Sequence, residues 1–522
     1  MRARLSSLSD PLGIALRRVR ASVSSPSVLR AMTVAVLALG GYLRLNRYID
    51  NRSLFLDEAY IASSVLSRDI VDLAKPLDYD QVAPFGWLAL VKLATELFGI
   101  SEPALRLVPL LSGLVSLALF YPLARRFLSH RGALIACTLM AATDPAIHWS
   151  VMVKPYSTDL LLAIAFLLLA TRVNWQRLSP GSTAYLAGLG ALALWFSNSA
   201  AFVLAAVGVY GLVSSGVDRS RGKRVHVAAI GAVWIISFGA LYFASLHAAI
   251  QNEFLRDYWR QRLVQLPTFD AERIAAQLAL LQGVFNDPVG LPPETGGALV
   301  FLIGLAVYLM ATPLEGGLLL APVAIAYLAS AAGIYPFWGR LLLFTVPSFH
   351  ILIAAGVEQI FHGVRRLGWI AVAGLMLVLL FVPLRLGISR GVNPRPLEEM
   401  RPVTAYVLRE YERGDAIYVY YGAEPAWKYY LKLFGATDIH YVEGIKARED
   451  PQKYNEEISQ FEGQKRVWLV FSHVHQGGLG SEESLILRRA RCLGTEIDIH
   501  EDFGAHAYLF DMTRPSTECE SR

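Results

Sequence analysis

The sequence predicts a mainly helical, polytopic membrane protein with about eleven transmembrane helices and a small C-terminal α/β domain outside the cytoplasm. Of its 522 residues, 54% are hydrophobic and only 17% are charged, and the mean hydropathy is +0.41. A soluble globular chain is typically about 45–50% apolar and about 25% charged. The composition therefore excludes a disordered chain and a coiled coil, and it favours a membrane protein over an ordinary soluble enzyme.

The charged residues divide the chain near Gly391. Residues 1–392 carry 32 lysines and arginines and 21 acidic residues, whereas residues 393–522 carry 16 and 22. We therefore expect a cytoplasmic N-terminus at 1–30, a transmembrane domain at 31–392 and a soluble domain of ordinary size after it. The net charge of +5 is small. Because basic residues of a membrane protein usually mark its topology, we expect no nucleic-acid partner.

The first apolar run, residues 31–49, follows the basic N-terminus without a small-residue cleavage site. We interpret it as an uncleaved signal-anchor helix in the cell (inner) membrane. Further runs long enough to cross a bilayer lie at 104–124, 132–149, 157–171, 183–198, 199–217, 227–248, 297–312, 316–333, 341–360 and 369–388.

Basic residues orient these predicted spans. Positive charges mark cytoplasmic segments, and here they gather at the N-terminus and in the loops at 125–131, 172–177, 219–224 and 365–366. An additional span at 83–99 would place three of these loops outside. The length of that run and its Lys92 and Glu96 instead fit a juxtamembrane or re-entrant helix. The number of spans is then odd, which places residues 393–522 outside the cytoplasm.

The soluble domain is expected to contain strands and could contain a disulfide. Strands are expected near Ala416–Tyr421, Val467–His475 and Ala507–Asp511. Two histidines of the second strand, His473 and His475, lack matching Cys or His partners, so a surface role is favoured over zinc. Cys492 and Cys519 could pair in an oxidising compartment, whereas Cys137 lies in an apolar run and is interpreted as an inert buried thiol.

The first outer loop, residues 50–82, contains seven of the 21 acidic residues of the membrane part. Within it, Asp57 and Glu58 stand between apolar residues close to the predicted membrane surface. Adjacent carboxylates in a medium of low dielectric raise each other's pKa. Such a pair suits a general base or a metal ligand, and the simpler alternative is a solvated loop.

Two other places at outer ends of spans carry ionisable groups. Lys154 could contact a phosphate, oriented by Asp159 in the following span; the alternative is a structural Lys154–Asp159 pair. Arg340 follows the aromatic segment that begins at Tyr335 and could clamp a phosphate with two hydrogen bonds. Its alternative is an interfacial arginine beside an aromatic belt.

The order of these motifs resembles that of the GT-C superfamily of membrane glycosyltransferases. The chain is most similar to the family of dolichyl-phosphate-mannose–protein mannosyltransferases and the bacterial lipid A aminoarabinose transferase. The resemblance covers roughly residues 30–390 and is most specific over 54–107. The matching stretches are Leu54-Phe55-Leu56-Asp57-Glu58-Ala59-Tyr60, Leu97–Leu107, Lys154–Asp159 and Tyr335–Arg340.

The resemblance implies a transferase that usually inverts the anomeric carbon and needs no nucleotide sugar. The donor would be a sugar on a polyprenyl phosphate in the lipid bilayer, and the acceptor a hydroxyl of a glycan, lipid or protein. Asp57, with Glu58 beside it, would supply the general base that a weak hydroxyl nucleophile needs. Lys154 and Arg340 would stabilise the leaving phosphate. No cofactor is required, and a divalent cation is compatible with the acidic loop.

The chain departs from the aminoarabinose transferases in the first outer loop. They carry a Glu-Lys pair just before the loop proline, whereas here Asp80-Gln81 precedes Val82-Ala83-Pro84 and the nearest lysine is Lys75. The phosphate contact from this loop and lipid A as acceptor are therefore not carried over. The predicted substrate-binding residues are Asp80, Gln81, Lys154, Tyr156, Asp159, Tyr335 and Arg340.

Two other classes of protein remain open: a polytopic lipid or sugar transporter or flippase, and a non-catalytic partner of a glycan-assembly complex. A transporter is expected to show paired half-repeats and helices broken by Gly or Pro at the bilayer midplane. Here the charges gather at outer ends of spans, and one long acidic loop follows the first helix. That placement favours an enzyme.

Overall fold

The computed structural model describes residues 25–216, 221–265, 270–363, 369–477 and 480–514. The chain divides into two compact units. The helical unit comprises residues 1–49, 82–87 and 106–394, and the loop–sheet unit comprises residues 50–81, 88–105 and 395–522. The first outer loop thus forms one unit with the C-terminal domain.

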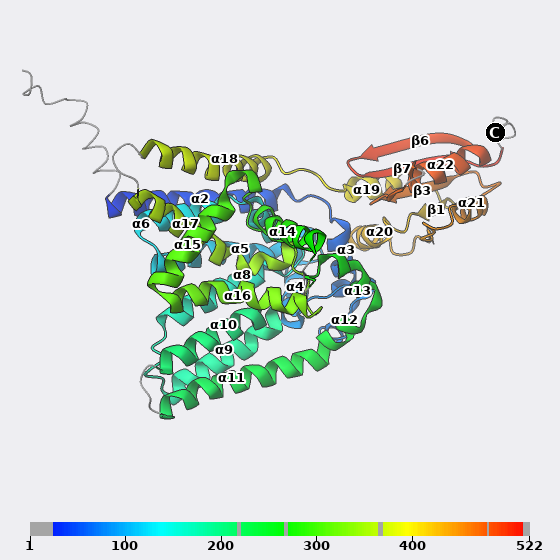
Figure 1. Ribbon diagram of the computed structural model, residues 1–522. Helices are drawn as coiled ribbons and strands as arrows, with labels where there is room; N and C mark the ends of the chain where they lie inside the picture. The colour runs from blue at the N-terminus through cyan, green and yellow to red at the C-terminus, as the bar shows by residue number, and fades with distance from the viewer. Residues whose placement is uncertain (1–24, 217–220, 266–269, 364–368, 478–479, 515–522) are drawn as a thin grey trace, which may run out of the picture. The chain divides into compact units, whose positions relative to one another are not determined.

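The helical unit consists of helices joined by short turns (Figure 1). Helices α9, α10 and α11 pack side by side within it. The helices with residues in this unit, of which α4 and α5 also have residues in the other, are α2 (Pro26–Asp50), α4 (Phe85–Phe98), α5 (Glu102–Phe127), α6 (His130–Ala142), α7 (Asp144–His148), α8 (Tyr156–Arg172), α9 (Pro180–Phe196), α10 (Ala200–Gly216), α11 (Arg221–Leu241), α12 (His247–Gln251), α13 (Glu253–Trp259), α14 (Ala271–Asn286), α15 (Gly297–Ala311), α16 (Pro313–Ala331), α17 (Val346–Gly363) and α18 (Trp369–Val392). Single turns are η3 (Trp149–Val151), the π-helical η4 (Tyr242–Leu246), η5 (Arg260–Arg262), η6 (Pro293–Thr295) and η7 (Gly339–Thr345).

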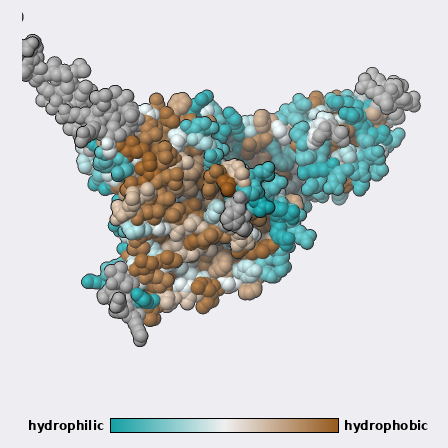
Figure 2. Space-filling model, viewed as in Figure 1, coloured by the Kyte–Doolittle hydropathy of each residue, from teal (hydrophilic) through white to brown (hydrophobic). Residues whose placement is uncertain are grey.

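The surface of the helical unit has the character of a membrane protein. Among the described residues, six helical segments are long and apolar enough to cross a membrane, and a seventh arises if Asp144–Val151 and Tyr156–Arg172, bent by 116°, form one span. Hydrophobic side chains cover much of its visible face (Figure 2), and the exposed ones include Ile235 and Phe243. A multi-pass membrane protein is thereby supported. The described residues of each predicted apolar run lie mainly in one helix or in consecutive helical segments, and the count of about eleven spans stays a prediction.

One predicted span, residues 132–149, is wrong as a continuous helix. Helix α6 ends at Ala142, Thr143 is extended, and α7 begins at Asp144. Pro145 lies in the first turn of α7, where its missing N–H has no intrahelical partner to lose, whereas it would break a helix interior. The chain therefore turns here and brings polar residues of α7 to a helix end.

Helices α15 and α17 approach each other closely through two glycines. A Cβ on Gly304 would lie 1.9 Å from the carbonyl oxygen of Leu352, and one on Gly356 would lie 2.0 Å from that of Val300. Both obstacles are backbone atoms, which cannot rotate away. Small residues allow such close contact between membrane helices.

Replacing Gly356 by alanine is expected to destabilise the protein by about 1–3 kcal/mol, because the added methyl group forces α15 and α17 apart. The measurement is denaturant unfolding of the purified protein in detergent. Gly317→Ala in α16 is the matched control, because no atom lies within 4 Å of its added Cβ. Equal losses in both variants would contradict the packing argument.

The loop–sheet unit is an α/β fold that includes the first outer loop, whose helical segments are α3 (Leu56–Ser67), η1 (Val71–Ala74) and η2 (Asp78–Asp80). One sheet has the order β2-β1-β3-β7-β6, with β1 parallel to β2 and β3, and β7 antiparallel to β3 and β6. The strands are β1 (Ala416–Val419), β2 (Val442–Glu443), β3 (Val467–Ser472), β6 (Thr495–Asp502) and β7 (Ala505–Asp511), while β4 (Gln476–Gly477) and β5 (Gly480–Ser481) form a separate pair. The helices after the first outer loop are α19 (Met400–Glu410), α20 (Glu424–Leu433), α21 (Gln452–Ser459) and α22 (Glu482–Leu493).

The three predicted strands are confirmed, with corrected ends: β1 ends at Val419 rather than Tyr421, and β7 begins at Ala505 rather than Ala507. Every residue of β3 is buried, as expected for an apolar strand covered on both faces. The strand ends at Ser472 rather than His475, because His473 has a φ of +51° that no strand accommodates. Cys137 is a buried free thiol, as predicted. Cys519, the N-terminal residues 1–24 and parts of two basic loops lie outside the described residues, so the disulfide and the topology stay predictions.

Candidate active site

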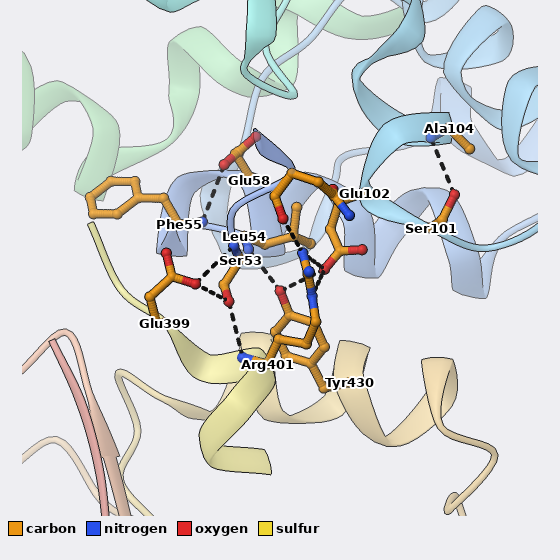
Figure 3. Close-up of polar contacts among 11 residues, drawn as sticks. Ser53, Leu54, Phe55, Glu58, Ser101, Glu102, Ala104, Glu399, Arg401 and Tyr430 are labelled. Atoms are coloured by element: carbon orange, nitrogen blue, oxygen red, sulfur yellow. Dashed lines mark hydrogen bonds and ion pairs between the residues drawn. The ribbon is translucent and has the colours of Figure 1, made fainter. Parts of the chain in front are cut away.

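Asp57 and Glu58 occupy the first turn of α3, but their environments differ. The Glu58 side chain is fully buried, and its Oε2 accepts a hydrogen bond from the backbone N–H of Phe55 at 3.2 Å (Figure 3). Glu58 therefore caps the helix by satisfying an amide that precedes it. Asp57 is only half-buried. Of the two predicted catalytic carboxylates, Asp57 is therefore the one that is partly exposed.

Two residues that the sequence did not single out share the environment of Asp57. Burial and, next, the charge of Asp57 raise the pKa of Tyr60 to about 12, with Glu398 and Glu424 adding to the effect. Tyr60 follows Asp57 by three residues, which places both on one face of α3. Glu398 precedes α19, more than three hundred residues away in the chain. No local sequence signal links it to the loop.

The start of the first outer loop is held by buried polar contacts (Figure 3). The backbone N–H of Leu54 donates to the hydroxyl of Tyr430 at 2.8 Å, and that hydroxyl donates to Glu102 Oε1 at 3.0 Å. Arg401 Nε also donates to Glu102 Oε1 at 2.7 Å, and Arg401 Nη2 donates to the carbonyl of Asn51 at 2.6 Å. Residues of the C-terminal domain thus fix the segment that leads into Asp57.

Asp80 and Gln81 lie at the end of the same loop. Asp80 is exposed, while Gln81 is half-buried and donates to the carbonyl of Tyr79 at 3.1 Å. Tyr79 has a φ of +55° and Asp80 one of +54°, a strained conformation of the kind that concentrates at functional sites. The Tyr79 ring stacks on Tyr60 at 4.6 Å, and its hydroxyl donates to Glu424 Oε2 at 2.7 Å. Tyr79 is therefore a site candidate that sequence reasoning missed.

In the helical unit, two predicted motifs meet although almost two hundred residues separate them. The guanidinium of Arg340, in η7, lies 5.5 Å from the ring centre of Trp149 and 5.8 Å from that of Tyr156. The Tyr335 hydroxyl donates to the carbonyl of Leu341 at 2.7 Å. Lys154 is buried just before α8. Aromatic faces attract a guanidinium, so the two rings help to hold Arg340 in place.

Asp159, in α8, is 7% exposed. The hydroxyls of Ser197 and Ser199, which lie between α9 and α10, are near its carboxylate. Among the described residues, its Oδ1 has no hydrogen-bond partner. The Lys154–Asp159 pair and the role of Asp159 in binding stay predictions.

A further ionic group in the helical unit is centred on Asp144. Its Oδ1 lies 3.3 Å from Arg47 Nη1 and its Oδ2 lies 2.6 Å from Arg390 Nη1, so the carboxylate joins α7 to α2 and α18. Arg47 Nη2 also lies 2.9 Å from His148 Nδ1. The only local signal for this residue is an Asp-Pro pair inside the predicted apolar run 132–149.

Asp287 faces the start of η7. A Cβ added to Gly339 would lie 2.8 Å from Asp287 Oδ2, and the φ of Gly339 is +42°. Burial raises the pKa of Asp287, while the charge of Arg340 opposes the increase. The glycine thus lets an acidic side chain approach the backbone beside Arg340, where it can help to orient the guanidinium.

Within the described ranges, no cluster of three or more His, Cys, Asp or Glu residues could hold a metal ion. His473 instead pairs with Glu398, which satisfies this histidine without zinc. A contribution from a divalent cation stays a prediction.

Comparison with known proteins supports the resemblance. Residues 82–243 match the family described as dolichyl-phosphate-mannose-protein mannosyltransferase. No curated protein sequence matches the chain. Among solved structures, apo ArnT from Cupriavidus metallidurans is 14% identical with a TM-score of 0.53, covering 93% of this chain and 98% of that chain.

Two further structures carry bound ligands. ArnT from Cupriavidus metallidurans bound to undecaprenyl phosphate is 15% identical with a TM-score of 0.51, covering 92% of this chain and 97% of that chain. AglB from Archaeoglobus fulgidus, an oligosaccharyltransferase in complex with an inhibitory peptide and a dolichol-phosphate, is 12% identical with a TM-score of 0.51, covering 93% and 74%. At these identities the likeness shows the fold alone. The chain therefore has a fold similar to that of ArnT and AglB, and its residues 82–243 are similar to the mannosyltransferase family.

Proposed function

We propose that the protein transfers a sugar from a polyprenyl phosphate to a hydroxyl acceptor at the outer face of the membrane, with inversion and with Asp57 as general base. The observation that carries this proposal is the half-buried carboxylate of Asp57 in the first turn of α3, beside a fully buried Glu58. The donor class is supported by the undecaprenyl phosphate and dolichol-phosphate named for ArnT and AglB.

In the proposed step, the acceptor hydroxyl oxygen attacks the anomeric carbon from the face opposite the phosphate. Asp57 takes the hydroxyl proton as the new C–O bond forms. The bond between the anomeric carbon and the phosphate oxygen breaks, and polyprenyl phosphate leaves with the electron pair. Attack on the opposite face inverts the configuration of that carbon.

The leaving phosphate gains negative charge, so cations are needed to stabilise it. We assign this role to Arg340 and Lys154. Arg340 is held over the rings of Trp149 and Tyr156, and the planar fork of donors of a guanidinium matches the geometry of a phosphate. Tyr156, Asp159, Tyr335, Asp80 and Gln81 are assigned to binding the remainder of the donor and the acceptor.

The proposal also places the protein in the cell (inner) membrane, with residues 393–522 outside the cytoplasm. This side follows from the basic loops described above, and it puts Asp57 on the side where the donor is presented. Acceptor glycans, lipids and proteins of the cell envelope share a free hydroxyl, which is the group that the base requires.

Purified protein in proteoliposomes is expected to transfer label from a radiolabelled polyprenyl-phosphate sugar to an envelope extract and to release free polyprenyl phosphate. A panel of lipid-linked sugars identifies the donor, and the matching nucleotide sugars, which should give no transfer, are the control. Transfer from nucleotide sugars alone would refute the proposal. Movement of the intact lipid-linked sugar across the bilayer, without transfer, would instead establish the flippase alternative.

A further inference from the structure

The first turn of α3 is anchored by a carboxylate of the C-terminal domain. Glu398 is 8% exposed, and its Oε2 accepts a hydrogen bond from the backbone N–H of Leu56 at 3.2 Å. This N–H is one of the amides that lack a partner at a helix start. Leu56 immediately precedes Asp57. The position of Glu398 therefore affects the residue next to the proposed base.

The other oxygen of Glu398 contacts a histidine. Glu398 Oε1 lies 2.6 Å from His473 Nδ1, and the His473 ring meets the ring of Phe55 edge-on at 5.6 Å. His473 thus contacts Phe55 directly, and it is linked to Leu56 through Glu398. These contacts connect the end of β3 to the first turn of α3.

The backbone of His473 is unusual for its residue type. Its φ of +51° lies in the left-handed region, which few residues other than glycine adopt. Such a conformation persists only where the surroundings hold it. Here the ion pair with Glu398 and the contact with Phe55 are the interactions that hold the ring.

The charges around His473 favour its protonated form. The hydrogen bond that His473 donates to Glu398 raises the pKa of the histidine above its usual value, burial opposes this, and the charges of Glu398 and Asp57 add to the increase. Arg448 is the cation that lowers it. A hydrogen bond between two charged groups is shorter and stronger than a neutral one, so the anchor is strongest while His473 is protonated.

We propose that His473 is a positioning residue: paired with Glu398, it fixes the first turn of α3 and thereby the carboxylate of Asp57. This inference rests on the proposed function of Asp57. It makes the C-terminal domain part of the catalytic apparatus, because a side chain at the end of β3 sets the geometry of a base in the first outer loop.

The pair also makes the rate depend on pH in a defined direction. His473 has a raised pKa in the folded protein, so its charged pair with Glu398 is complete at lower pH. The pair weakens as pH rises through that raised pKa. The turnover number of the wild-type protein is therefore expected to fall as the pH rises through the pKa of His473. We call this decline the basic limb of the pH profile.

His473→Ala is expected to lower kcat by about 10- to 100-fold with little change in KM, the size of effect that a misplaced catalytic group produces. His473→Asn tests the charge separately. Asparagine tolerates the left-handed backbone and can still donate to Glu398, but it does not titrate. We expect this variant to recover much of the rate and to lose the fall at high pH.

The matched control is His506→Ala. His506, in β7, forms an equivalent pair in the same domain, with Nδ1 2.7 Å from Glu483 Oε1, and its pKa is likewise raised by that hydrogen bond. This variant should keep the wild-type kcat and pH profile.

The outcomes separate the two levels of the proposal. A wild-type protein that transfers no sugar overturns the proposed function itself. Wild-type transfer together with an unaltered kcat and pH profile in His473→Ala overturns only the positioning role. The same loss of rate in His506→Ala also overturns it, because the effect would then be a general one on the domain. An unchanged basic limb in His473→Asn overturns the pH dependence.

Discussion

Replacing Asp57 by asparagine is expected to lower the rate of sugar transfer by about 10²- to 10⁴-fold, the usual contribution of a positioned general base. Asparagine has nearly the same size and keeps one acceptor oxygen, but it cannot take the proton of the acceptor hydroxyl. Donor binding should be largely preserved. The measurement is kcat at saturating labelled polyprenyl-phosphate sugar in proteoliposomes.

Two other acids of the loop serve as controls for Asp57. Asp69 is exposed, so Asp69→Asn should leave the rate unchanged. Glu58→Gln should reduce the yield of folded protein before it affects kcat, because Glu58 is a fully buried helix cap. Full transfer by a folded Asp57→Asn variant would remove Asp57 from the reaction.

Replacing Glu102 by glutamine is expected to destabilise the loop–sheet unit by about 3 kcal/mol, the lower end of the loss when one partner of a buried ion pair is removed. Glu102 is 3% exposed at its side chain and lies 2.6 Å from Arg401 Nη2, which is itself 30% exposed. The change leaves the guanidinium without a counter-charge and weakens the acceptor of Tyr430. A thermal-shift assay in detergent should show an earlier transition.

The control for Glu102 lies in α19, the helix that carries Arg401. Glu410 pairs with Arg409 at 2.9 Å, but the two side chains are 45% and 67% exposed. Exposed pairs of this kind contribute little to stability. The Glu410→Gln variant should therefore unfold at the same temperature as the wild type. Equal stability of all three proteins would show that the Glu102–Arg401 pair does not hold the loop.

The elements with a strong local pattern were predictable from the sequence. The run Val467–Ser472 is uninterruptedly apolar or small and became the buried central strand β3. The apolar runs of the membrane part became helices, because length and hydropathy alone decide that outcome. The break at Thr143 was not predicted because the Asp-Pro pair lowers the mean hydropathy of its run too little to remove the run as a predicted span.

The candidate site was predictable only in part, since its contacts join distant parts of the chain. The sequence alone does not tell which carboxylate of the Asp57-Glu58 pair is structural. The register of α3 decides this, because it makes Glu58 the helix cap and leaves Asp57 half-buried. Glu398 and Leu56 are 342 residues apart in sequence. No periodicity or local motif predicts a contact over such a distance in the sequence. The contact becomes visible only in the folded loop–sheet unit.

The loop–sheet unit combines segments that the ribosome makes at very different times. Glu102 is made 299 residues before Arg401. At about 5–20 residues per second, that interval lasts about 15–60 s. During this time the first outer loop and Glu102 exist without their partners Glu398, Arg401 and Tyr430. The contacts that hold the proposed catalytic loop can therefore form only after the helical unit has been synthesised.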